Sequence, residues 1–406
     1  MILIMAWRNI WRNKMRSIVI MLSIALGLFA GIGVLSLYKG MMRSRVRTVI
    51  DAEVGHLQVH DSNFKKDYEP AFVISNGLGI LKKIRSMPGV KFAAPRSITN
   101  GMLATATGSA GVQINGVEPQ DEYNASQLKA KIMDGKLFDS TKKSEVMIGK
   151  KLAKKMKLKT GSKLVLTFTD SSGTIVSAAF RVVAVYESNN APLDERNVYI
   201  NIHSMNELLT TGNTFHEIVV LLNRDEDVPL LQQQMQQQFS NYKIESWKEI
   251  SPETDLMVQT TDQLSYILMT IIMFALAFGI INTMLMAILE RTKEIGMMVA
   301  LGTSKIKMFL LVLSETVFLT LAGAPVGVLI GWLVINYFNK HGLDMSGMGR
   351  EMMSSFGYST LIFPEFPSDK LAGVLLIVCC TALLSCLFPA IKALKLQPVE
   401  ALRGMR

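Results

Sequence analysis

Four long apolar blocks constrain this chain more than any other feature. They cover residues 18–38, 264–289, 308–338 and 371–391, and the only charge inside them is Glu315 in the third. A helix needs about 20 apolar residues to cross a hydrocarbon core of roughly 30 Å. All four blocks reach that length, and charged residues make up only 19% of the chain. We therefore expect an α-helical membrane protein with four spans.

Two of the blocks need interpretation. The third is longer than one span requires, and Gly323-Ala324-Pro325 inside it predicts a kinked helix rather than two helices. The first has 21 residues, whereas the apolar region of a cleaved signal peptide has about 7–15. We interpret it as a span that is retained.

Lysine and arginine residues predict the orientation. The leader (1–17), the loop 290–307 and the tail (392–406) carry four of them each, whereas the loop 339–370 carries three. Short loops rich in Lys and Arg stay in the cytoplasm. We expect both termini to be cytoplasmic, with residues 39–263 and the loop 339–370 on the outer side.

The leader has an amphipathic pattern. Trp7 and Trp11 recur at helical spacing, and Arg8 and Arg12 lie beside them. Tryptophan prefers the membrane interface, where a basic amphipathic helix lies flat. The pattern predicts an interfacial helix over residues 1–17; the alternative is a simple extension of the first span.

The outer domain mixes strand and helix patterns. Two similar strand–helix–strand units bracket a middle segment, in which Asp170-Ser171-Ser172-Gly173 marks a tight hairpin. We expect an α/β domain built as one lobe from about 40–117 and 214–250, with a β-rich lobe from about 118–213 inserted into it.

Common enzyme motifs are missing from the sequence. It contains no G-x-x-x-x-G-K-[ST] phosphate loop, no H-E-x-x-H and no G-x-S-x-G. His56 and His60 lie on a predicted strand, where four residues span about 13 Å, too far to share a metal ion. The lysine-rich run 150–163 lacks aromatic residues for base stacking. We expect no catalytic, metal or nucleic-acid site, no cofactor in this chain, and a solvated helix face at the lysine run.

Two polar groups lie inside predicted spans, Asn282 in the second and Glu315 in the third. Such groups inside a membrane are functional candidates. Hydrogen bonding within the helix bundle is one interpretation, and coupling of helix movements is the other. A proton relay needs several such groups, which the other spans lack.

The loop after the second span is the most informative stretch. Alternating charges begin it, apolar residues follow, and a glycine ends it. This pattern predicts a short helix that docks into a partner's groove, or a plain interfacial helix. Its candidate residues are Glu290, Arg291, Lys293, Glu294, Ile295, Gly296, Ala300, Leu301 and Gly302.

This loop resembles the E-R-x-x-E-I-G-x-x-x-A-L-G signature of the FtsX/MacB-type (type VII) ABC-transporter permeases. The leader, Trp7 to Arg12, is similar to that family's start, and Gly55-His56-Leu57-Gln58-Val59 resembles its lipoprotein-releasing (LolC/LolE-like) members. The tail is similar to the family's P-V-E-A-L-R ending at Pro398, Val399, Glu400, Leu402 and Arg403.

The resemblance implies a permease subunit that contains no nucleotide site and works with a separate ABC ATPase dimer, which binds ATP and Mg. The loop 290–307 would be the coupling helix. A second permease, identical or not, would pair with this one across spans one and two. The inserted lobe would correspond to the family's Sabre lobe.

The implied activity is mechanotransmission in the bacterial inner membrane, with lipoproteins or other lipid-anchored cargo extracted from the outer leaflet. A periplasmic chaperone or adaptor would be a further partner. The tight turn at Asp170 to Gly173 departs from the family's chaperone-gripping hook. The alternatives are MacB-like efflux and FtsX-like regulation of cell-wall hydrolases.

Overall fold

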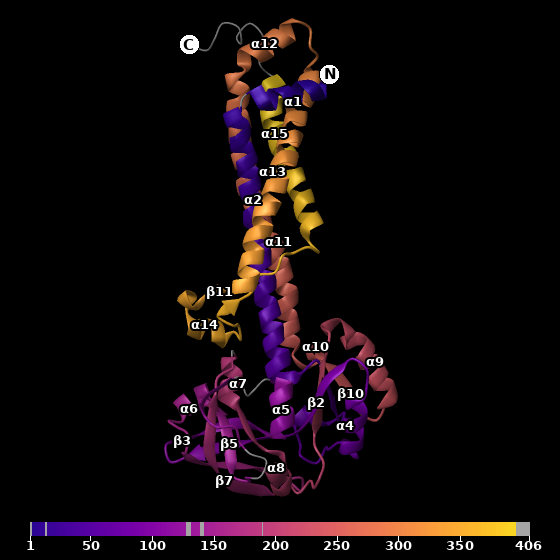
Figure 1. The fold of residues 1–406 in the computed structure, drawn as a ribbon, viewed down its shortest axis with the longest axis vertical. Coiled ribbons are helices and arrows are strands. Elements are labelled where there is room, and N and C mark those ends of the chain that lie inside the picture. Colours follow the sequence, from indigo (N-terminus) through magenta and orange to yellow (C-terminus); the bar gives the residue numbers. More distant parts are fainter. Residues whose placement is uncertain (1, 13, 127–130, 139–141, 189, 395–406) are drawn as a thin grey trace. The chain divides into compact units, whose positions relative to one another are not determined.

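The computed structural model describes residues 2–12, 14–126, 131–138, 142–188 and 190–394. The chain divides into two compact units, whose elements are labelled in Figure 1. We call them the helical unit (residues 1–42, 258–344 and 361–406) and the α/β unit (residues 43–257 and 345–360).

Four helices are long and apolar enough to cross a membrane, which confirms the prediction of four spans. They are α2 (Lys14–Val49), α11 (Pro252–Glu290), α13 (Lys305–His341) and α15 (Leu371–Leu394). Helix α2 runs 11 residues past the predicted end at 38, because no proline follows the apolar block and its arginines are good helix formers. Pro325 lies inside the single helix α13, as expected.

The described part of the leader is helical. Helix α1 covers Ile2–Arg12 and α2 begins at Lys14, and residue 13 between them lies outside the described residues. The Ser17 hydroxyl of α2 donates a hydrogen bond of 2.7 Å to the carbonyl of Ile10 on α1. Ala6 and Ile10 form the buried face of α1.

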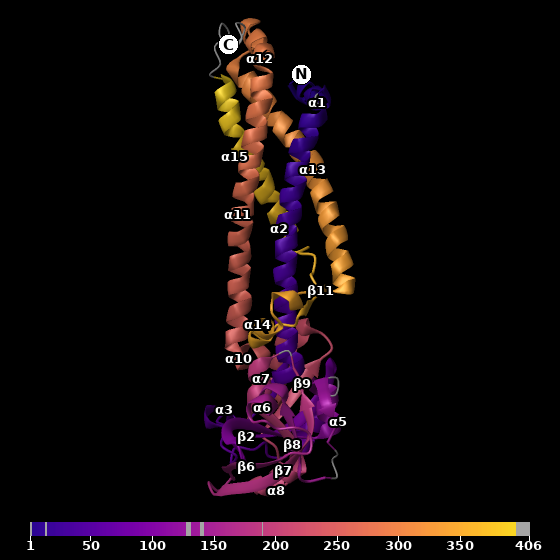
Figure 2. The ribbon, with the colours of Figure 1, turned by 90° about the vertical axis from the view of Figure 1, so that its left-hand side faces the viewer.

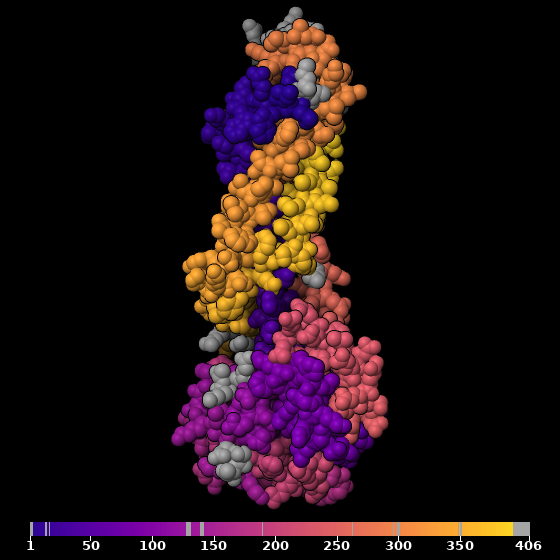
Figure 3. Space-filling model, turned by 45° about the vertical axis from the view of Figure 1, so that its right-hand side comes forward, coloured from indigo at the N-terminus to yellow at the C-terminus, as the bar shows by residue number. Residues whose placement is uncertain are grey.

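The spans are closely packed at a stripe of glycines. On α13, Gly323 and Gly327 face α2, where an added Cβ would lie 2.8 Å from the carbonyl oxygen of Met21 and 2.7 Å from that of Ala25. Small residues let two spans approach this closely. Helix α15 lies beside α13 (Figure 3). The core between these helices includes Ile24, Leu28, Ile32, Met273, Ile280, Leu319 and Val378.

Shorter elements complete the helical unit. Helix α12 (Thr292–Ala300) lies between α11 and α13 in the chain, and β11 (Leu343–Asp344) pairs with β12 (Leu361–Ile362). Lys39, which follows the apolar part of α2, forms an ion pair of 2.7 Å with Asp369.

The α/β unit is built on one sheet with the strand order β10-β1-β9-β2-β3-β8-β5-β7-β4, and β6 pairs with β2 and β7. The strands are β1 (Leu57–His60), β2 (Val90–Thr105), β3 (Gly108–Val117), β4 (Ile132–Gly135), β5 (Glu145–Gly149), β6 (Lys163–Thr169), β7 (Ile175–Tyr186), β8 (Asn197–Asn201), β9 (Glu217–Leu222) and β10 (Lys243–Ser246). All six residues of β9 are buried, as befits a strand between two neighbours.

Short helices complete the α/β unit. They are α3 (Phe64–Asp67), α4 (Gly77–Arg85), α5 (Pro119–Ser126), α6 (Lys150–Lys155), α7 (Ala191–Arg196), α8 (Ile202–Leu209), α9 (Val228–Gln238), α10 (Trp247–Ile250) and α14 (Arg350–Ser355). The π-helical turn η1 (Ile50–Val54) and the 3₁₀ turns η3 (Asp225–Asp227) and η4 (Ser346–Met348) are the remaining helical pieces. Helix α4 buries Ile80, Leu81 and Ile84, which share one helix face.

Four apolar cores lie in the α/β unit, and the boundary between the two largest differs from the predicted one. The first includes Leu57, Val59, Ile80, Ala93, Ile218 and Phe239, and the second includes Leu103, Val112, Ile114, Val146, Leu166 and Ile200. Residues 101–117 therefore belong with the inserted lobe, not with the segment 40–117. The reason is that β2 is one strand of 16 residues: its first part pairs with β9, and residues 101–104 pair with β6. Because β2 continues from one core into the other without a turn, no turn residues in the sequence mark the boundary between the two lobes.

The predicted hairpin at Asp170 to Gly173 is a tight turn between β6 and β7. The carboxylate of Asp170 accepts hydrogen bonds of 2.9 Å from the backbone N–H groups of Ser172 and Thr174. Gly173 has φ +85°, which a residue without Cβ adopts at little cost.

A buried charge cluster stabilises the α/β unit. The Arg96 guanidinium donates bonds of 2.9 and 2.6 Å to the two carboxylate oxygens of Glu122, and a third of 2.6 Å to the backbone carbonyl of Glu53. Glu217 lies 3.6 Å away, and Arg96 is only 4% exposed. Removal of one partner from such a cluster leaves a buried charge uncompensated.

We expect Arg96→Leu to lower the free energy of unfolding by about 3–5 kcal/mol, because two buried carboxylates lose their cation. Trp247 is buried in this unit and can report urea unfolding once the other three tryptophans are phenylalanine. The control is Lys143→Leu, which removes an exposed ion pair with Glu207 and should cost less than about 1 kcal/mol. Equal effects of the two changes would contradict this assignment.

Candidate functional site

The predicted docking loop forms a helix with a defined end. In the helical unit, α12 lies at the same end as α1 (Figures 1 and 2). Gly302 has φ +89°, and the N–H of Thr303 bonds to the carbonyl of Met298 at 3.0 Å. This pattern is the Schellman motif, in which a left-handed glycine stops a helix. The Ser304 side chain then caps α13 by accepting from the N–H of Lys307.

Large apolar side chains are exposed at this end. Leu301 is 80% exposed, the highest value for a large apolar side chain among the described residues, and Ile306 and Met297 are 71% and 53% exposed. Gly296 is buried, whereas Glu290 and Lys293 are exposed. Exposed apolar groups in such a cluster are typical of a surface that a partner covers. We call Met297, Leu301 and Ile306 the apolar tip.

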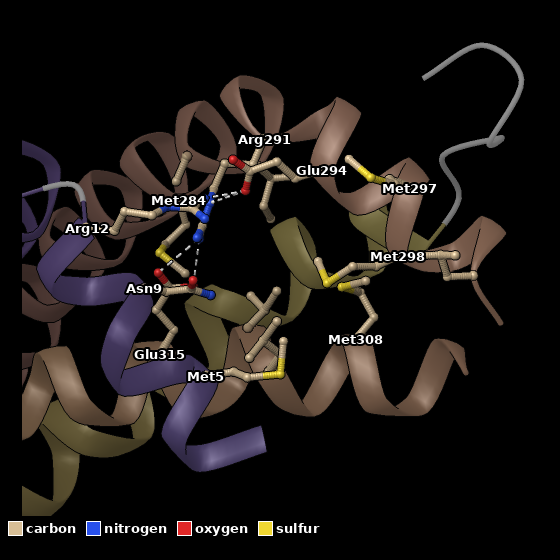
Figure 4. A pocket seen from close by; sticks show the side chains of 15 residues that line it. Met5, Asn9, Arg12, Met284, Arg291, Glu294, Met297, Met298, Met308 and Glu315 are labelled. Atoms are coloured by element: carbon tan, nitrogen blue, oxygen red, sulfur yellow. Dashed lines mark hydrogen bonds and ion pairs between the residues drawn. The ribbon is translucent and has the colours of Figure 1, made fainter. Parts of the chain in front are cut away.

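A chain of ion pairs joins α12 to α1 and α13 (Figure 4). The Arg291 guanidinium lies 3.3 Å from a carboxylate oxygen of Glu315 on α13 and 3.4 Å from one of Glu294 on α12. Glu294 also pairs with Arg12 of α1. The Arg12 hydrogen bond holds the pKa of Glu294 below its usual value, so this carboxylate is ionised at neutral pH. These ion pairs therefore link α12 to two further helices.

A cavity of about 340 Å³ lies beside this ion-pair chain. Arg12, Arg291, Glu294 and Glu315 form its polar wall, and most of the remaining lining is apolar. Its methionines, Met5, Met284, Met297, Met298 and Met308, come from α1, α11, α12 and α13 (Figure 4). Methionine side chains adapt to changes of shape, so the lining can repack when the helices move.

The two intramembrane candidates have different surroundings. Glu315 is buried and faces Arg291, which is the arrangement expected for bundle-facing hydrogen bonding. Asn282 is exposed on α11. An amide on the lipid-facing surface of a span has no water to bond with, so contact with a partner helix that offers a hydrogen bond is favoured.

The other candidates are placed as follows. Trp7 and Trp11 are about half exposed on α1, and the ring of Trp7 meets that of Phe318 on α13 edge to face, with centroids 5.6 Å apart. Arg8 is exposed. The side chains of Ile295 and Ala300, and the C-terminal motif of Pro398, Val399, Glu400, Leu402 and Arg403, lie outside the described residues.

Two features of this site were not predicted from the sequence. Arg12 was expected only at the membrane interface, whereas the Arg12 guanidinium pairs with Glu294. The methionines of the cavity were assigned no role. The chain contains 26 methionines, several of them near the ends of the apolar blocks, and that enrichment is a signal that sequence reasoning could have used.

The two histidines of the outer domain have separate partners. The ring of His56 bonds to Asp225 and that of His60 to Glu245, each at 2.9 Å. No group of three or more metal-ligating side chains comes together within the described ranges.

Two family models match the sequence. The MacB-like periplasmic core domain matches residues 17–238, and the FtsX-like permease C-terminal domain matches residues 266–398. The first of these covers more than half of the chain.

Relatives extend over nearly all of the chain. The lipoprotein-releasing system transmembrane protein LolC of Neisseria meningitidis is 24% identical, and the match covers 97% of this chain and 95% of LolC. The macrolide export ATP-binding/permease protein MacB of Bdellovibrio bacteriovorus is 25% identical over 96% of this chain, but only 60% of that protein is covered. Among solved structures, the periplasmic region of MacB from Actinobacillus actinomycetemcomitans is 14% identical with a TM-score of 0.37, covering 55% of this chain and 97% of that one.

Proposed function

Because this chain belongs to the FtsX-like family of ABC-transporter permeases with a MacB-like periplasmic core domain, we propose that it transmits ATP-driven movement from a separate ABC ATPase to its α/β unit. The apolar tip carries this proposal. Met297, Leu301 and Ile306 are exposed beside a chain of ion pairs, so a partner that covers the tip also pushes on α1 and α13 through Arg291 and Glu294.

We further propose that the cargo is a lipoprotein or another lipid-anchored molecule in the outer leaflet of a bacterial inner membrane. The match to LolC supports this, because it spans 95% of a protein named for lipoprotein release. In this proposal both termini are cytoplasmic and the ATPase supplies the ATP and Mg site. A periplasmic chaperone or adaptor would receive the cargo. The matches to MacB proteins favour export as the second candidate.

Purification of the tagged full chain from its native membrane in mild detergent, followed by mass spectrometry, tests this function. We expect an ABC ATPase together with acylated lipoproteins, and neither in the untagged control. An ATPase with a periplasmic adaptor, or with a cell-wall hydrolase and no lipoproteins, would replace lipoprotein release by export or regulation. Recovery without any ATPase would contradict the whole proposal.

Two such permeases are proposed to pair across α2 and α11. In the most apolar 18-residue stretch of each spanning helix, only 28–39% of the residues are buried within one chain. Most of the surface of these helices therefore faces lipid or a partner. Exposed side chains on α11 form one stripe at helical spacing, namely Ile267, Ile271, Phe274, Phe278, Asn282 and Met286. Asn282 interrupts this apolar stripe, and a second permease gives its amide a hydrogen-bond partner that lipid lacks.

Cysteine cross-linking in membranes tests the pairing. In a variant whose three native cysteines are alanine, Asn282→Cys should form a cross-linked dimer, or a cross-link to a second permease of the same family. Leu384→Cys is the control, because Leu384 is 66% exposed on α15, a helix that is not part of the proposed pairing surface. Equal cross-linking at both positions would contradict the pairing.

A further inference from the structure

Part of the lysine-rich run 150–163 is not a simple solvated face. Lys150, Lys151 and Lys154 of α6 lie on the wall of a cavity of about 440 Å³ in the α/β unit. Lys131, which immediately precedes β4, joins them from another part of the chain. Four ammonium groups therefore meet at one cavity, although sequence spacing brings only three of them together.

The rest of the wall is polar and comes from two further segments. The stretch around α7 contributes Glu187, Ser188 and Asp194, and the segment 345–360 contributes Glu351, Ser354, Tyr358 and Thr360. All of these residues belong to the same compact unit as the lysines. Serine, threonine and tyrosine hydroxyls add hydrogen-bond donors to a basic wall.

Three of the four ammonium groups have no carboxylate bonded to them. Lys150 forms an ion pair of 2.9 Å with Glu187. The Lys131 ammonium donates a hydrogen bond of 3.1 Å to the backbone carbonyl of Ser126, a neutral partner. Within the described part of the chain, the ammonium groups of Lys151 and Lys154 form no hydrogen bond or ion pair. These three ammonium groups are thus open to an anion, although the charges of Asp51, Asp194, Glu122 and Glu53 act on Lys131, and that of Glu195 on Lys151, without bonding to them.

The acidic groups at the cavity compensate only part of this charge. Asp194 is buried, and both of its carboxylate oxygens accept hydrogen bonds from Ser188. Burial raises the pKa of Asp194 to about 7, so the group is about half neutral at neutral pH. Glu351 is exposed on α14. Burial also lowers the pKa of Lys131, and a bound anion would stabilise its charged form.

We propose that this cavity binds a phosphate group, as a mono- or diester, with Lys131, Lys151 and Lys154 as its cationic partners. A phosphate offers several acceptor oxygens and so engages more than one ammonium at once. The same chemistry is found on a lipid headgroup and on a soluble phosphate ester. Binding would connect α6 with the segment 345–360.

Calorimetry and native mass spectrometry of the full-length protein in neutral detergent test the site. Glycerol 3-phosphate is titrated at an ionic strength of about 0.1 M and again at about 1 M, where the Debye length falls from about 10 to 3 Å. We expect saturable binding that weakens at high salt. In parallel, mass spectrometry compares retained phosphatidylglycerol with a neutral diacylglycerol.

Matched variants localise the binding. Lys151→Gln with Lys154→Gln should weaken it at least tenfold, whereas Lys159→Gln with Lys163→Gln, two exposed lysines of the same run outside the cavity, should leave it within twofold. Loss of glycerol phosphate binding in the first pair assigns a soluble ester as ligand. Loss of lipid retention alone assigns a headgroup. The proposal would be overturned if the wild-type protein neither binds glycerol 3-phosphate nor retains phosphatidylglycerol in preference to diacylglycerol. It would also be overturned if the two pairs of variants bind these ligands equally well.

Discussion

Replacement of Leu301 by aspartate is expected to abolish association with the ABC ATPase. Leu301 is 80% exposed at the end of α12, where Gly302 stops the helix. Burial of a leucine side chain in a partner's groove is worth about 1.5–3 kcal/mol, and a carboxylate in its place also loses hydration. The summed loss is about 3 kcal/mol or more, on the order of a hundredfold in affinity.

Co-purification of the ATPase with the tagged permease measures this effect. Leu78→Asp is the matched control, because Leu78 is an exposed leucine on α4 of the α/β unit. We expect wild-type yields of ATPase with the control and a near-complete loss with Leu301→Asp, while both variants insert normally. A wild-type yield with Leu301→Asp would show that α12 is not the docking helix.

Replacement of Arg291 by methionine is expected to separate docking from transmission. Arg291 is the only group in the ion-pair chain that contacts both Glu294 and Glu315 in the described structure. Methionine keeps much of the side chain's length but removes both charged contacts. We therefore expect the ATPase to bind within twofold of wild type. The response of the α/β unit to ATP should fall about tenfold, because α12 can then move without α13.

Electron spin–spin distances between labels on two copies of the α/β unit measure that response. A label at Lys159, which is exposed, should change its distance distribution when ATP and vanadate are added to the wild-type complex. The change should be absent in Arg291→Met and partly restored by the exchanged pair Arg291→Glu with Glu315→Arg. An undiminished change in Arg291→Met would show that this ion-pair chain is not the route.

The sequence predicted the spans well because the signal of each span is local and does not depend on the rest of the chain. Each apolar block alone satisfies the length that a bilayer demands, whatever its neighbours do. The ends of the helices were harder to predict, because α2 continues through polar residues for which the bilayer argument has no rule. The hydrogen bond from the Ser17 hydroxyl to the carbonyl of Ile10 links α2 to α1, and a side-chain bond of this kind has no periodic signal.

The candidate site was predictable only in part. The charge pattern and terminal glycine of the loop indicated a short docking helix, and Gly302 does stop α12. The partners of Arg291 and Arg12 depend on how α1, α12 and α13 cross, which no local pattern specifies. For the same reason, Lys131 meets Lys151 and Lys154 only because the folded sheet brings β4 near α6.

A photo-activated cross-linking residue at position 301, in the full chain in its native membrane, tests whether α12 docks on an ABC ATPase. We expect irradiation to join this position to an ABC ATPase, identified by mass spectrometry, and the same residue at position 78 to yield no such product. Cross-links from position 301 to lipid alone, or to proteins other than an ABC ATPase, would contradict it.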